Sequence, residues 1–254
     1  MQGEMGKKMS KFVEGTVVGK RRWAERLYSL QVAAEVAPFQ AGQFTKLALD
    51  INGEMVGRAY SFINAPGETP LEFYFIEVPG GLLTQRLAVL EAGDAVWVAP
   101  QAAGFLTLSE VPNAKHLWLL STNTGIAPFL SILKTEEPWQ RFERVVLAHA
   151  VRYADELANG ETIRDFAQQH GEQFRFVPFV SRADTNFALR ARIPETIADG
   201  RLEAKAGVAL APESSQVMLC GNPDMVRDTT EALLVRGLKK NRRRDPGHIT
   251  VESY

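Results

Sequence analysis

Hydrophobic positions in the first part of the chain, to about residue 108, occur as short runs separated by turn residues. Each run is rich in β-branched or aromatic residues and is bounded by Gly, Pro, Asn or Asp, which is typical of strands. The spacing predicts an antiparallel β-barrel of six strands, interrupted by a helix-like stretch at Leu83–Leu90. The predicted strands are Val13–Lys20, Leu27–Ala33, Phe44–Asp50, Ala59–Ile63, Leu71–Val78 and Ala95–Ala99.

The second part alternates short apolar runs with helical patterns. Four apolar residues between Ile126 and Leu133 repeat at the spacing of one helical face. Asn222-Pro223 provides a cap and a first-turn proline for a helix that runs to about Gly237. This alternation predicts a parallel, Rossmann-like α/β sheet with helices on both faces. The predicted strands are His116–Ser121, Arg144–Ala150, Phe174–Ser181 and Gln216–Cys220.

The change of rhythm predicts two domains, residues 9–110 and 111–254, with the boundary near Val111-Pro112-Asn113. No internal repeat or low-complexity segment is present. The polar leader Met1 to Lys8 is set aside from the fold, because an upstream start or an added extension would explain it equally.

Composition narrows the class of protein. The 254 residues are 45% apolar, which is enough for a substantial core. The 29 basic residues nearly balance the 30 acidic ones in charge. A balanced charge argues against nucleic-acid binding, because phosphate binding favours a basic excess. No run approaches the roughly 18 apolar residues of a membrane span, and the N-terminus lacks a hydrophobic signal segment. A cytoplasmic protein that binds no membrane is expected.

The chain has one cysteine, Cys220, and four scattered histidines. An intramolecular disulfide is therefore excluded, and a cysteine-ligated iron–sulfur cluster needs about four thiolates. No Cys/His spacing typical of a metal site occurs, so no metal is expected. If the protein handles electrons, an organic cofactor has to carry them.

Arg58-Ala59-Tyr60-Ser61 is the first segment with candidate chemistry. Strand alternation places Arg58 and Tyr60 on one face and Ala59 and Ser61 on the other. An arginine fork can neutralise a pyrophosphate, a tyrosine can stack on a flat ring, and a serine can reach a ring nitrogen. Taken alone, an edge strand with a surface arginine is the simpler interpretation.

Pro79-Gly80-Gly81-Leu82-Leu83-Thr84 is the second segment. Its glycines let the backbone approach a ligand, and Thr84 stands where a helix can begin. A helix N-terminus offers unpaired N–H groups to a phosphate. The alternative is an ordinary hairpin-to-helix turn capped by Thr84.

Ser121–Pro128 and Cys220–Pro223 each join an apolar strand to a helix. Ligands of open α/β sheets bind beyond the carboxyl ends of the strands. The first segment has the context of a dinucleotide-phosphate loop without the G-x-G-x-x-G pattern, so a βα turn with hydroxyl caps is the alternative. Cys220 is expected to point into the crevice, although a lone thiol is commonly a small buried hydrophobe.

Four arginines and the C-terminus complete the pattern. Clustered arginines suit the extra 2′-phosphate of NADP, whereas a solvated loop position is the alternative for each one alone. The chain ends in a β-type segment with an acid, Glu252, and a terminal aromatic, Tyr254, for which a frayed tail is the alternative. The four arginines are Arg152, Arg182, Arg190 and Arg192.

In this order, the six features resemble the ferredoxin/flavodoxin–NADP reductases, and most closely their compact bacterial branch. The likeness runs from about Phe12 to Tyr254. It implies a barrel that binds FAD, with Arg58 at the pyrophosphate, Tyr60 on the isoalloxazine and Ser61 near flavin N5. The FAD contacts that it implies are Arg58, Ala59, Tyr60, Ser61, Phe75, Ile76, Glu77, Val78, Gly81, Leu82, Leu83, Thr84, Thr124 and Tyr254.

The same resemblance implies an α/β domain that binds NADP(H). It places Cys220 near the nicotinamide and Glu252, a candidate proton relay, near the flavin. The catalytic residues that it implies are Ser61, Cys220, Glu252 and Tyr254. The NADP(H) contacts that it implies are Thr122, Asn123, Arg152, Arg182, Arg190, Arg192, Asn222, Asp224 and Met225.

Two positions depart from the family pattern. Asn123 stands where the phosphate loop usually has the first glycine of Thr-Gly-Thr-Gly. Asparagine is the next best residue after glycine at positive φ, but its side chain is expected to crowd the pyrophosphate and weaken NADP(H) binding. Tyr254 ends the chain, as in the plastid branch, whereas bacterial relatives often carry one more aromatic. Its ring is expected to stack on the isoalloxazine face that nicotinamide must enter.

The expected activity is hydride transfer between nicotinamide C4 and flavin N5, with ferredoxin or flavodoxin as the electron partner of a monomer. Lys239–Arg244 is a candidate docking patch for an acidic partner, and Lys20-Arg21-Arg22 fits a solvated surface better. Two alternatives stay open: an NAD(P)H-dependent flavin reductase or oxygenase reductase component, and a non-enzymatic flavin-binding electron-transfer subunit. Many proteins of both kinds carry cluster cysteines, which this chain lacks.

Overall fold

The computed structural model describes residues 11–253, so the polar leader and the C-terminal residue lie outside it. The chain divides into two compact units between Phe105 and Leu106, a few residues before the predicted boundary. The segment between the two positions belongs to the second unit because its apolar side chains, including Leu108 and Val111, are buried. The Arg141 guanidinium also donates to the carbonyls of Leu108 and Val111 at 2.8 and 2.7 Å.

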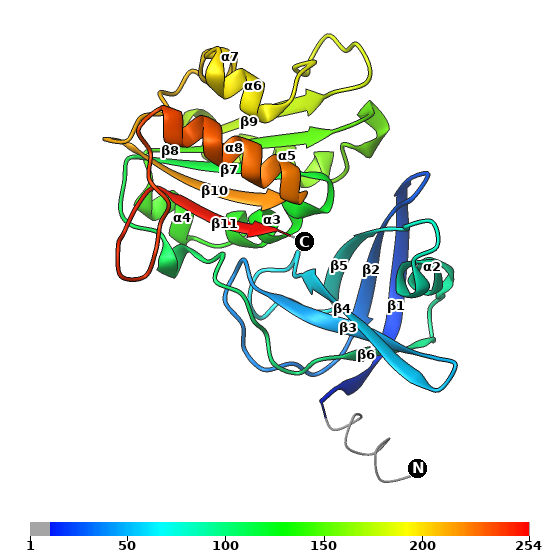
Figure 1. Ribbon diagram of the computed structural model, residues 1–254. Coiled ribbons are helices and arrows are strands. Elements are labelled where there is room, and N and C mark those ends of the chain that lie inside the picture. Colours follow the sequence, from blue (N-terminus) through cyan, green and yellow to red (C-terminus); the bar gives the residue numbers. More distant parts are fainter. Residues whose placement is uncertain (1–10, 254) are drawn as a thin grey trace. The chain divides into compact units, whose positions relative to one another are not determined.

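The first unit is an antiparallel sheet of six strands in the order β4-β3-β6-β1-β2-β5 (Figure 1). This confirms the predicted six-stranded barrel. Aliphatic and aromatic side chains, among them Leu30, Leu47 and Phe73, fill its core. Helix α2 (Leu82–Val89) follows the fifth strand. The strands are β1 (Val13–Ala24), β2 (Leu27–Ala33), β3 (Phe44–Ile51), β4 (Glu54–Ser61), β5 (Leu71–Ile76) and β6 (Ala95–Val98).

Strand β4 begins earlier than the predicted Ala59–Ile63. It forms a hairpin with β3 around Asn52-Gly53, whose φ angles of 57° and 83° are both positive, as a type I′ turn requires. The residues that the predicted strand missed, Glu54–Arg58, include two charged residues and a glycine and lie on an edge strand. An edge strand buries few side chains, so its apolar pattern is weak.

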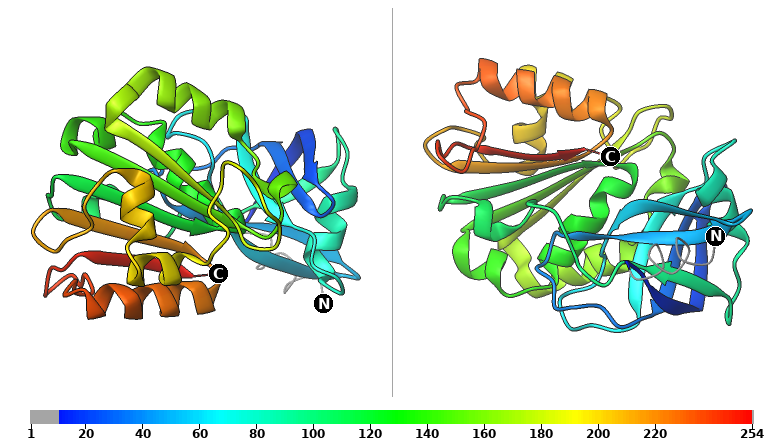
Figure 2. Two further views of the ribbon diagram at one scale, coloured as in Figure 1. Left: turned by 90° about the horizontal axis from the view of Figure 1, so that it is seen from above. Right: turned by 60° about the horizontal axis from the view of Figure 1, so that its bottom comes forward.

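The second unit is a parallel sheet of five strands in the order β11-β10-β7-β8-β9, with helices on both faces (Figure 2). This confirms the predicted α/β architecture, and the β-type C-terminus is an ordered strand rather than a frayed tail. Because β8 and β9 extend the sheet on one side of β7 and β10 and β11 on the other, the strand order switches between β7 and β10. Ligands bind at such switch points. The strands are β7 (His116–Thr122), β8 (Arg144–Val151), β9 (Phe174–Val180), β10 (Ser215–Gly221) and β11 (Ile249–Ser253).

Helix α8 (Pro223–Val235) begins as predicted, since Asn222 accepts a hydrogen bond from the Asp224 N–H at 2.9 Å. Helix α3 (Ala127–Leu133) is buried on every side rather than on one face. No helix within residues 11–253 is long and apolar enough to cross a membrane. The other helices are α4 (Glu137–Arg141), α5 (Gly160–His170), α6 (Ile193–Ala198) and α7 (Arg201–Ala206), and the 3₁₀ turns are η1 (Leu108–Glu110), η2 (Asn123–Ile126), η3 (Ala154–Glu156) and η4 (Gly171–Gln173).

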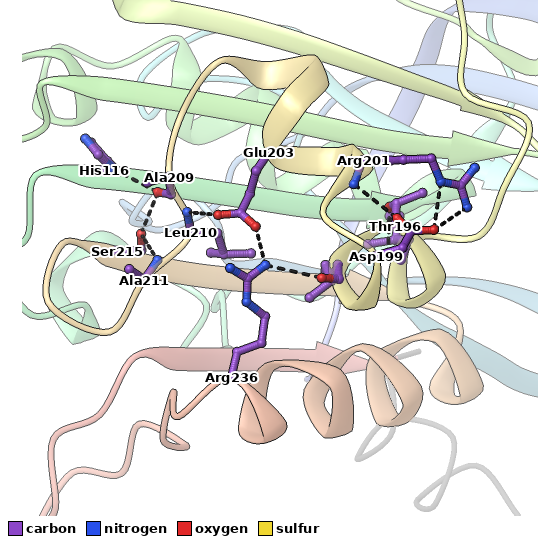
Figure 3. A network of polar contacts seen from close by, with 12 residues as sticks. His116, Thr196, Asp199, Arg201, Glu203, Ala209, Leu210, Ala211, Ser215 and Arg236 are labelled. Carbon is purple, nitrogen blue, oxygen red and sulfur yellow. Dashed lines mark hydrogen bonds and ion pairs between the residues drawn. The ribbon is translucent and has the colours of Figure 1, made fainter.

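Glu203 on α7 connects three segments of this unit (Figure 3). Its carboxylate accepts from the Leu210 N–H at 2.7 Å and pairs with Arg236, which also donates to the Ile197 carbonyl at 3.2 Å. Partial burial raises the pKa of Glu203, but the hydrogen bonds from Arg236 and Leu210 outweigh it and hold the pKa below its usual value. The charged pair therefore fixes α6, α7 and the end of α8 relative to one another.

Candidate functional site

Tyr60 on β4 is supported by a buried aromatic residue of β5. The rings of Tyr60 and Phe75 meet edge to face with centroids 6.4 Å apart, and Phe75 in turn stacks on Tyr28 at 5.5 Å. Burial raises the pKa of Tyr60 to about 12, against the opposing effect of the Arg58 charge. The phenol therefore stays protonated at neutral pH, and a half-buried, uncharged ring suits contact with a flat conjugated group.

Arg58 presents its charge to solvent on the same strand. Its guanidinium donates to the neighbouring Gly57 carbonyl at 2.8 Å, and it forms no ion pair within the described part of the chain. Most of its donors are therefore available to an anion. Exposure does not follow the predicted alternation here, because Arg58 and Ala59 are both exposed and Tyr60 and Ser61 are both half-buried.

A tight turn connects β5 to α2. The Gly81 N–H donates to the Val78 carbonyl at 2.8 Å, with Pro79 and then Gly80 between them, and Gly80 has a φ of 75°, as a type II turn requires. A Cβ atom on Gly81 would lie 2.7 Å from Thr84 Oγ1. Glycine at position 81 therefore lets the turn close tightly against Thr84 and Val78.

The prediction that Thr84 begins or caps the helix is wrong. The cap position is Gly81, which has no side chain to cap with, and Thr84 lies in the first turn of α2. The Thr84 hydroxyl accepts instead from the Val78 N–H at 3.0 Å, so it closes the turn. The first N–H groups of α2 are thereby left without a side-chain acceptor, which suits a phosphate.

The remaining predicted residues of this unit differ in exposure. Ile76 and Glu77 are half-buried, and Leu82 is exposed. The Glu77 N–H donates to the Arg26 carbonyl at 2.8 Å, so pairing continues beyond the end of β5. Leu83 packs in the barrel core, and only its backbone is available to a cofactor.

A cavity of about 310 Å³ opens at the carboxyl ends of β7, β8, β9 and β10. It lies at the switch point of the sheet, where the topology favours a ligand. The structure brings together at this cavity all the predicted NADP(H) contacts except Arg190. The lining residues are Thr122, Asn123, Ala150, Val151, Arg152, Ser181, Arg182, Ala191, Arg192, Ile193, Pro194, Asn222, Asp224, Met225 and Asp228.

Arg190 is engaged elsewhere. Its guanidinium lies 2.8 Å from both carboxylate oxygens of Asp184. The pair is exposed and belongs to the loop between β9 and α6. Arg152, Arg182 and Arg192 line the cavity and are the arginines available to a bound phosphate.

The loop after β7 has a left-handed backbone conformation at Asn123, the position where the family pattern usually has a glycine. Asn123 has a φ of 48°, so this position requires the left-handed region that glycine and asparagine tolerate. Thr122 Oγ1 accepts from the Asn222 N–H at 3.1 Å, which connects the loops at the ends of β7 and β10. Thr124 is half-buried in the 3₁₀ turn η2.

Gly125 allows these two loops to meet. A Cβ atom at this position would lie 2.4 Å from the Cys220 carbonyl oxygen and 2.9 Å from the Gly221 Cα atom. Both are backbone atoms of β10 and cannot move independently of the sheet. Glycine is therefore the residue that permits this close approach of the two loops.

Cys220 and Glu252 lie opposite each other on the neighbouring parallel strands β10 and β11. Cys220 is 2% exposed and does not line the cavity, so the expectation that it points into this crevice is wrong. Burial and then the Glu252 charge raise the pKa of the Cys220 thiol, which stays protonated. Burial raises the pKa of Glu252 to about 7, a value suited to proton transfer near neutral pH. Tyr254 lies outside the described residues.

The raised pKa of Glu252 predicts a pH-dependent stability. Its pKa is about 7 in the folded protein against 4.5 for a free glutamate, so the folded state binds this proton more tightly. The free energy of unfolding should therefore fall as pH rises from 4.5 through 7, by about 1–2 kcal/mol for a partly exposed group. In urea unfolding, the difference between the free energies of unfolding at pH 4.5 and pH 8 should be smaller for Glu252→Gln than for the native protein by about this amount.

Glu231→Gln is the matched control, because Glu231 lies exposed on α8. It should keep the native pH dependence. A Glu252→Gln protein with the same pH dependence as the native protein would contradict the assignment.

Two polar residues of the cavity were not predicted. Ser181 comes directly after β9 and donates to the Val151 carbonyl at 3.2 Å. Asp228 follows Asp224 by one helical turn, so both reach the same side of α8. Neither residue belongs to a recognisable motif. Ser181 could have been found from its position at the end of a predicted strand, and Asp228 from its position one helical turn after Asp224.

Comparisons with known proteins agree with this geometry. Residues 119–231 match the family of oxidoreductase NAD-binding domains. The flavodoxin/ferredoxin–NADP reductase of Escherichia coli is 46% identical over 97% of this chain and 100% of its own. The ferredoxin–NADP reductase of Pseudomonas aeruginosa is 34% identical over 96% and 98%.

Solved structures extend the likeness. A ferredoxin NADP⁺ reductase from Neisseria gonorrhoeae with bound FAD and NADP superposes with a TM-score of 0.91 at 35% identity, covering 96% of this chain and 98% of that one. The FAD/NAD-binding domain of a Vibrio cholerae nitric oxide dioxygenase shares the fold alone, with a TM-score of 0.76 at 18% identity over 95% and 98%. The chain therefore belongs to the family of flavodoxin/ferredoxin–NADP reductases.

Proposed function

We propose that this chain is an FAD-dependent reductase that transfers electrons between NADPH and ferredoxin or flavodoxin. The observation that carries the proposal is the cavity at the strand switch point, lined by Arg152, Arg182 and Arg192. Three arginines suit a dinucleotide with an additional phosphate. The barrel would bind FAD and the α/β unit NADP(H), with the functional boundary near residue 110.

The first unit fits FAD. Arg58 offers free donors to a pyrophosphate, the N-terminus of α2 has no side-chain cap, and Tyr60 presents a half-buried neutral ring. The backbone of Phe75 to Val78 would lie along the cofactor. When bound, FAD supplies the redox chemistry, by exchanging a hydride with nicotinamide C4 at flavin N5 and single electrons with the protein partner.

The chain's own groups would control position and protons. Ser61 would offer its hydroxyl to the flavin ring. Glu252 would hold or release a proton near neutral pH, because burial raises its pKa to about 7. Cys220 would act as a neutral thiol that packs beside Glu252. Tyr254 would cover the ring face that nicotinamide enters.

Asn123→Gly is expected to tighten NADP(H) binding by about two- to fivefold, because glycine adopts a φ of 48° at lower cost and removes a side chain from the cavity. Titration of both proteins with NADP⁺ measures the change. Asn159→Gly is the control, since Asn159 also has a positive φ of 61° but begins helix α5. Equal affinity of the native and Asn123→Gly proteins would refute crowding by this side chain.

The two basic patches differ in their internal contacts. In the first, Lys20 pairs with Glu91 at 2.8 Å, Arg22 donates to the Glu25 carbonyl at 2.8 Å, and Arg21 lies 3.7 Å from the Trp23 ring centre. These cations are used within the barrel, which supports a solvated structural role.

The second patch is free to dock a partner. Its cations, Lys239, Lys240 and Arg242–Arg244, are exposed and form no ion pair among residues 11–253. Asn241 anchors the loop by donating to the Glu110 carbonyl at 2.7 Å and to Thr250 Oγ1 at 3.1 Å. An anchored loop that presents unpaired positive charge suits the electrostatic steering of an acidic protein.

Reversing Arg242, Arg243 and Arg244 to glutamate should slow reduction of ferredoxin or flavodoxin by about tenfold at low salt and flatten its salt dependence. Stopped-flow reduction at increasing salt measures both. Reversal of Lys115, Arg164 and Lys205, which are exposed elsewhere on the second unit, applies the same charge change and should have a smaller effect. Unchanged partner kinetics in the first variant would exclude docking at this loop.

Acceptor specificity tests the proposed function. NADPH oxidation should be fast with ferredoxin or flavodoxin as the acceptor and slow with free flavin as the acceptor. With the protein acceptors, NADH should be oxidised more slowly than NADPH. Activity with free flavin alone would favour a flavin reductase instead. The cytoplasmic location and the monomeric state stay predictions.

A further inference from the structure

The cavity in the second unit is not uniformly basic. Its wall on α8 carries two carboxylates, Asp224 and Asp228, whereas the three arginines come from the segments after β8 and β9 and from the loop before α6. The two acids lie one helical turn apart, and their side chains are 74% and 41% exposed. Negative charge on this wall opposes the binding of any phosphate.

Arg227 contacts both of these carboxylates. One terminal guanidinium nitrogen donates to Asp224 Oδ1 at 2.8 Å, the Nε atom donates to Asp228 Oδ1 at 3.0 Å, and the other terminal nitrogen lies 2.9 Å from the same oxygen. A planar guanidinium can reach two acids at once in this way, which an ammonium group cannot match. Arg227 itself is not among the residues that line the cavity.

Carboxylates in a dinucleotide crevice have a known effect on nucleotide choice. An acidic residue that accepts from the ribose 2′-hydroxyl favours NAD and repels the 2′-phosphate of NADP. An α8 wall with two unpaired aspartates would therefore favour the wrong nucleotide for this enzyme.

We propose that Arg227 determines nucleotide specificity by neutralising Asp224 and Asp228, so that an acidic cavity wall accepts NADP(H). This inference rests on the proposed function, because it takes NADP(H) as the ligand. Arg227 is a positioning residue, since it acts through the two aspartates. The three lining arginines would bind the 2′-phosphate directly, whereas Arg227 would remove the repulsion between that phosphate and the two aspartates.

Calorimetric titration of the FAD-loaded protein with NADP⁺ and with NAD⁺ tests the proposal. Arg227→Gln should weaken NADP⁺ binding by about tenfold and NAD⁺ binding by less than about threefold, because the 2′-phosphate carries the additional charge. Replacing both aspartates by asparagine in the Arg227→Gln protein should restore the native NADP⁺ to NAD⁺ ratio. The same two replacements with Arg227 present should raise that ratio above the native one.

Arg201→Gln is the matched control, because Arg201 also forms an exposed pair with an aspartate, Asp199, but on α7. It should leave both affinities unchanged. The proposal is overturned if Arg227→Gln leaves the NADP⁺ to NAD⁺ ratio unchanged, or if the asparagine replacements do not restore it. Failure of the native protein to bind NADP⁺ would instead overturn the proposed function.

Discussion

Replacing Gly125 with alanine is expected to weaken NADP(H) binding by at least tenfold and to destabilise the second unit by about 1–3 kcal/mol. The added methyl would lie 2.4 Å from the Cys220 carbonyl oxygen. Because that oxygen belongs to β10, which pairs with a strand on each side, the loop after β7 has to move away from β10. Thr122 and Asn123 then lose their positions at the cavity.

NADP⁺ titration and thermal unfolding measure the two effects of Gly125→Ala. Bound FAD should be retained, because the residues proposed to hold it belong to the first unit. Gly160→Ala is the control, since its Cβ atom would have only Arg164 at 3.5 Å within contact range and alanine favours a helix. Native affinity and stability of Gly125→Ala would show that the two loops do not need this close approach.

Replacing Arg58 with alanine is expected to lower FAD affinity by about 10- to 100-fold, because charge-assisted hydrogen bonds contribute about 1.5–3 kcal/mol each. Arg58 is exposed, and its donors are free apart from the bond to the Gly57 carbonyl. Its loss should therefore affect the ligand more than the barrel. The fraction of FAD that remains bound after dialysis measures the change.

Arg58→Lys should show an intermediate loss, since lysine keeps the charge without the planar fork. Arg26→Ala removes a second exposed arginine of the same unit and should retain FAD. If Arg58→Ala retains FAD as well as Arg26→Ala does, Arg58 does not bind the pyrophosphate.

Strand positions were largely predictable from the sequence, because each strand in the two sheets buries a recurrent apolar pattern. The predicted start differs most from the observed one in β4. Strand β4 starts at Glu54 on the edge of the sheet, where few side chains are buried and the pattern fades. The observed boundary between the units lies a few residues before the predicted one. Arg141, which is distant in the sequence, binds the carbonyls of Leu108 and Val111 and so holds the connecting segment on the second unit.

Local motifs predicted which segments form the candidate site, but not what each side chain does there. Thr84 closes a turn instead of capping a helix, and Arg190 pairs with Asp184 away from the cavity. Cys220 is buried beside Glu252. In each case, a partner that lies near only in the folded chain decides the outcome. The Arg227 contacts are of the same kind, since the sequence shows the charges but not that one guanidinium bridges both acids.

The most direct test of the central claim is the visible spectrum of the purified protein during anaerobic addition of NADPH. The proposed function predicts a yellow protein whose flavin absorption bleaches with one equivalent of NADPH and returns when oxidised ferredoxin or flavodoxin is added. NADH should bleach it more slowly. A protein that binds no FAD, or a bound flavin that NADPH does not reduce, would contradict the claim.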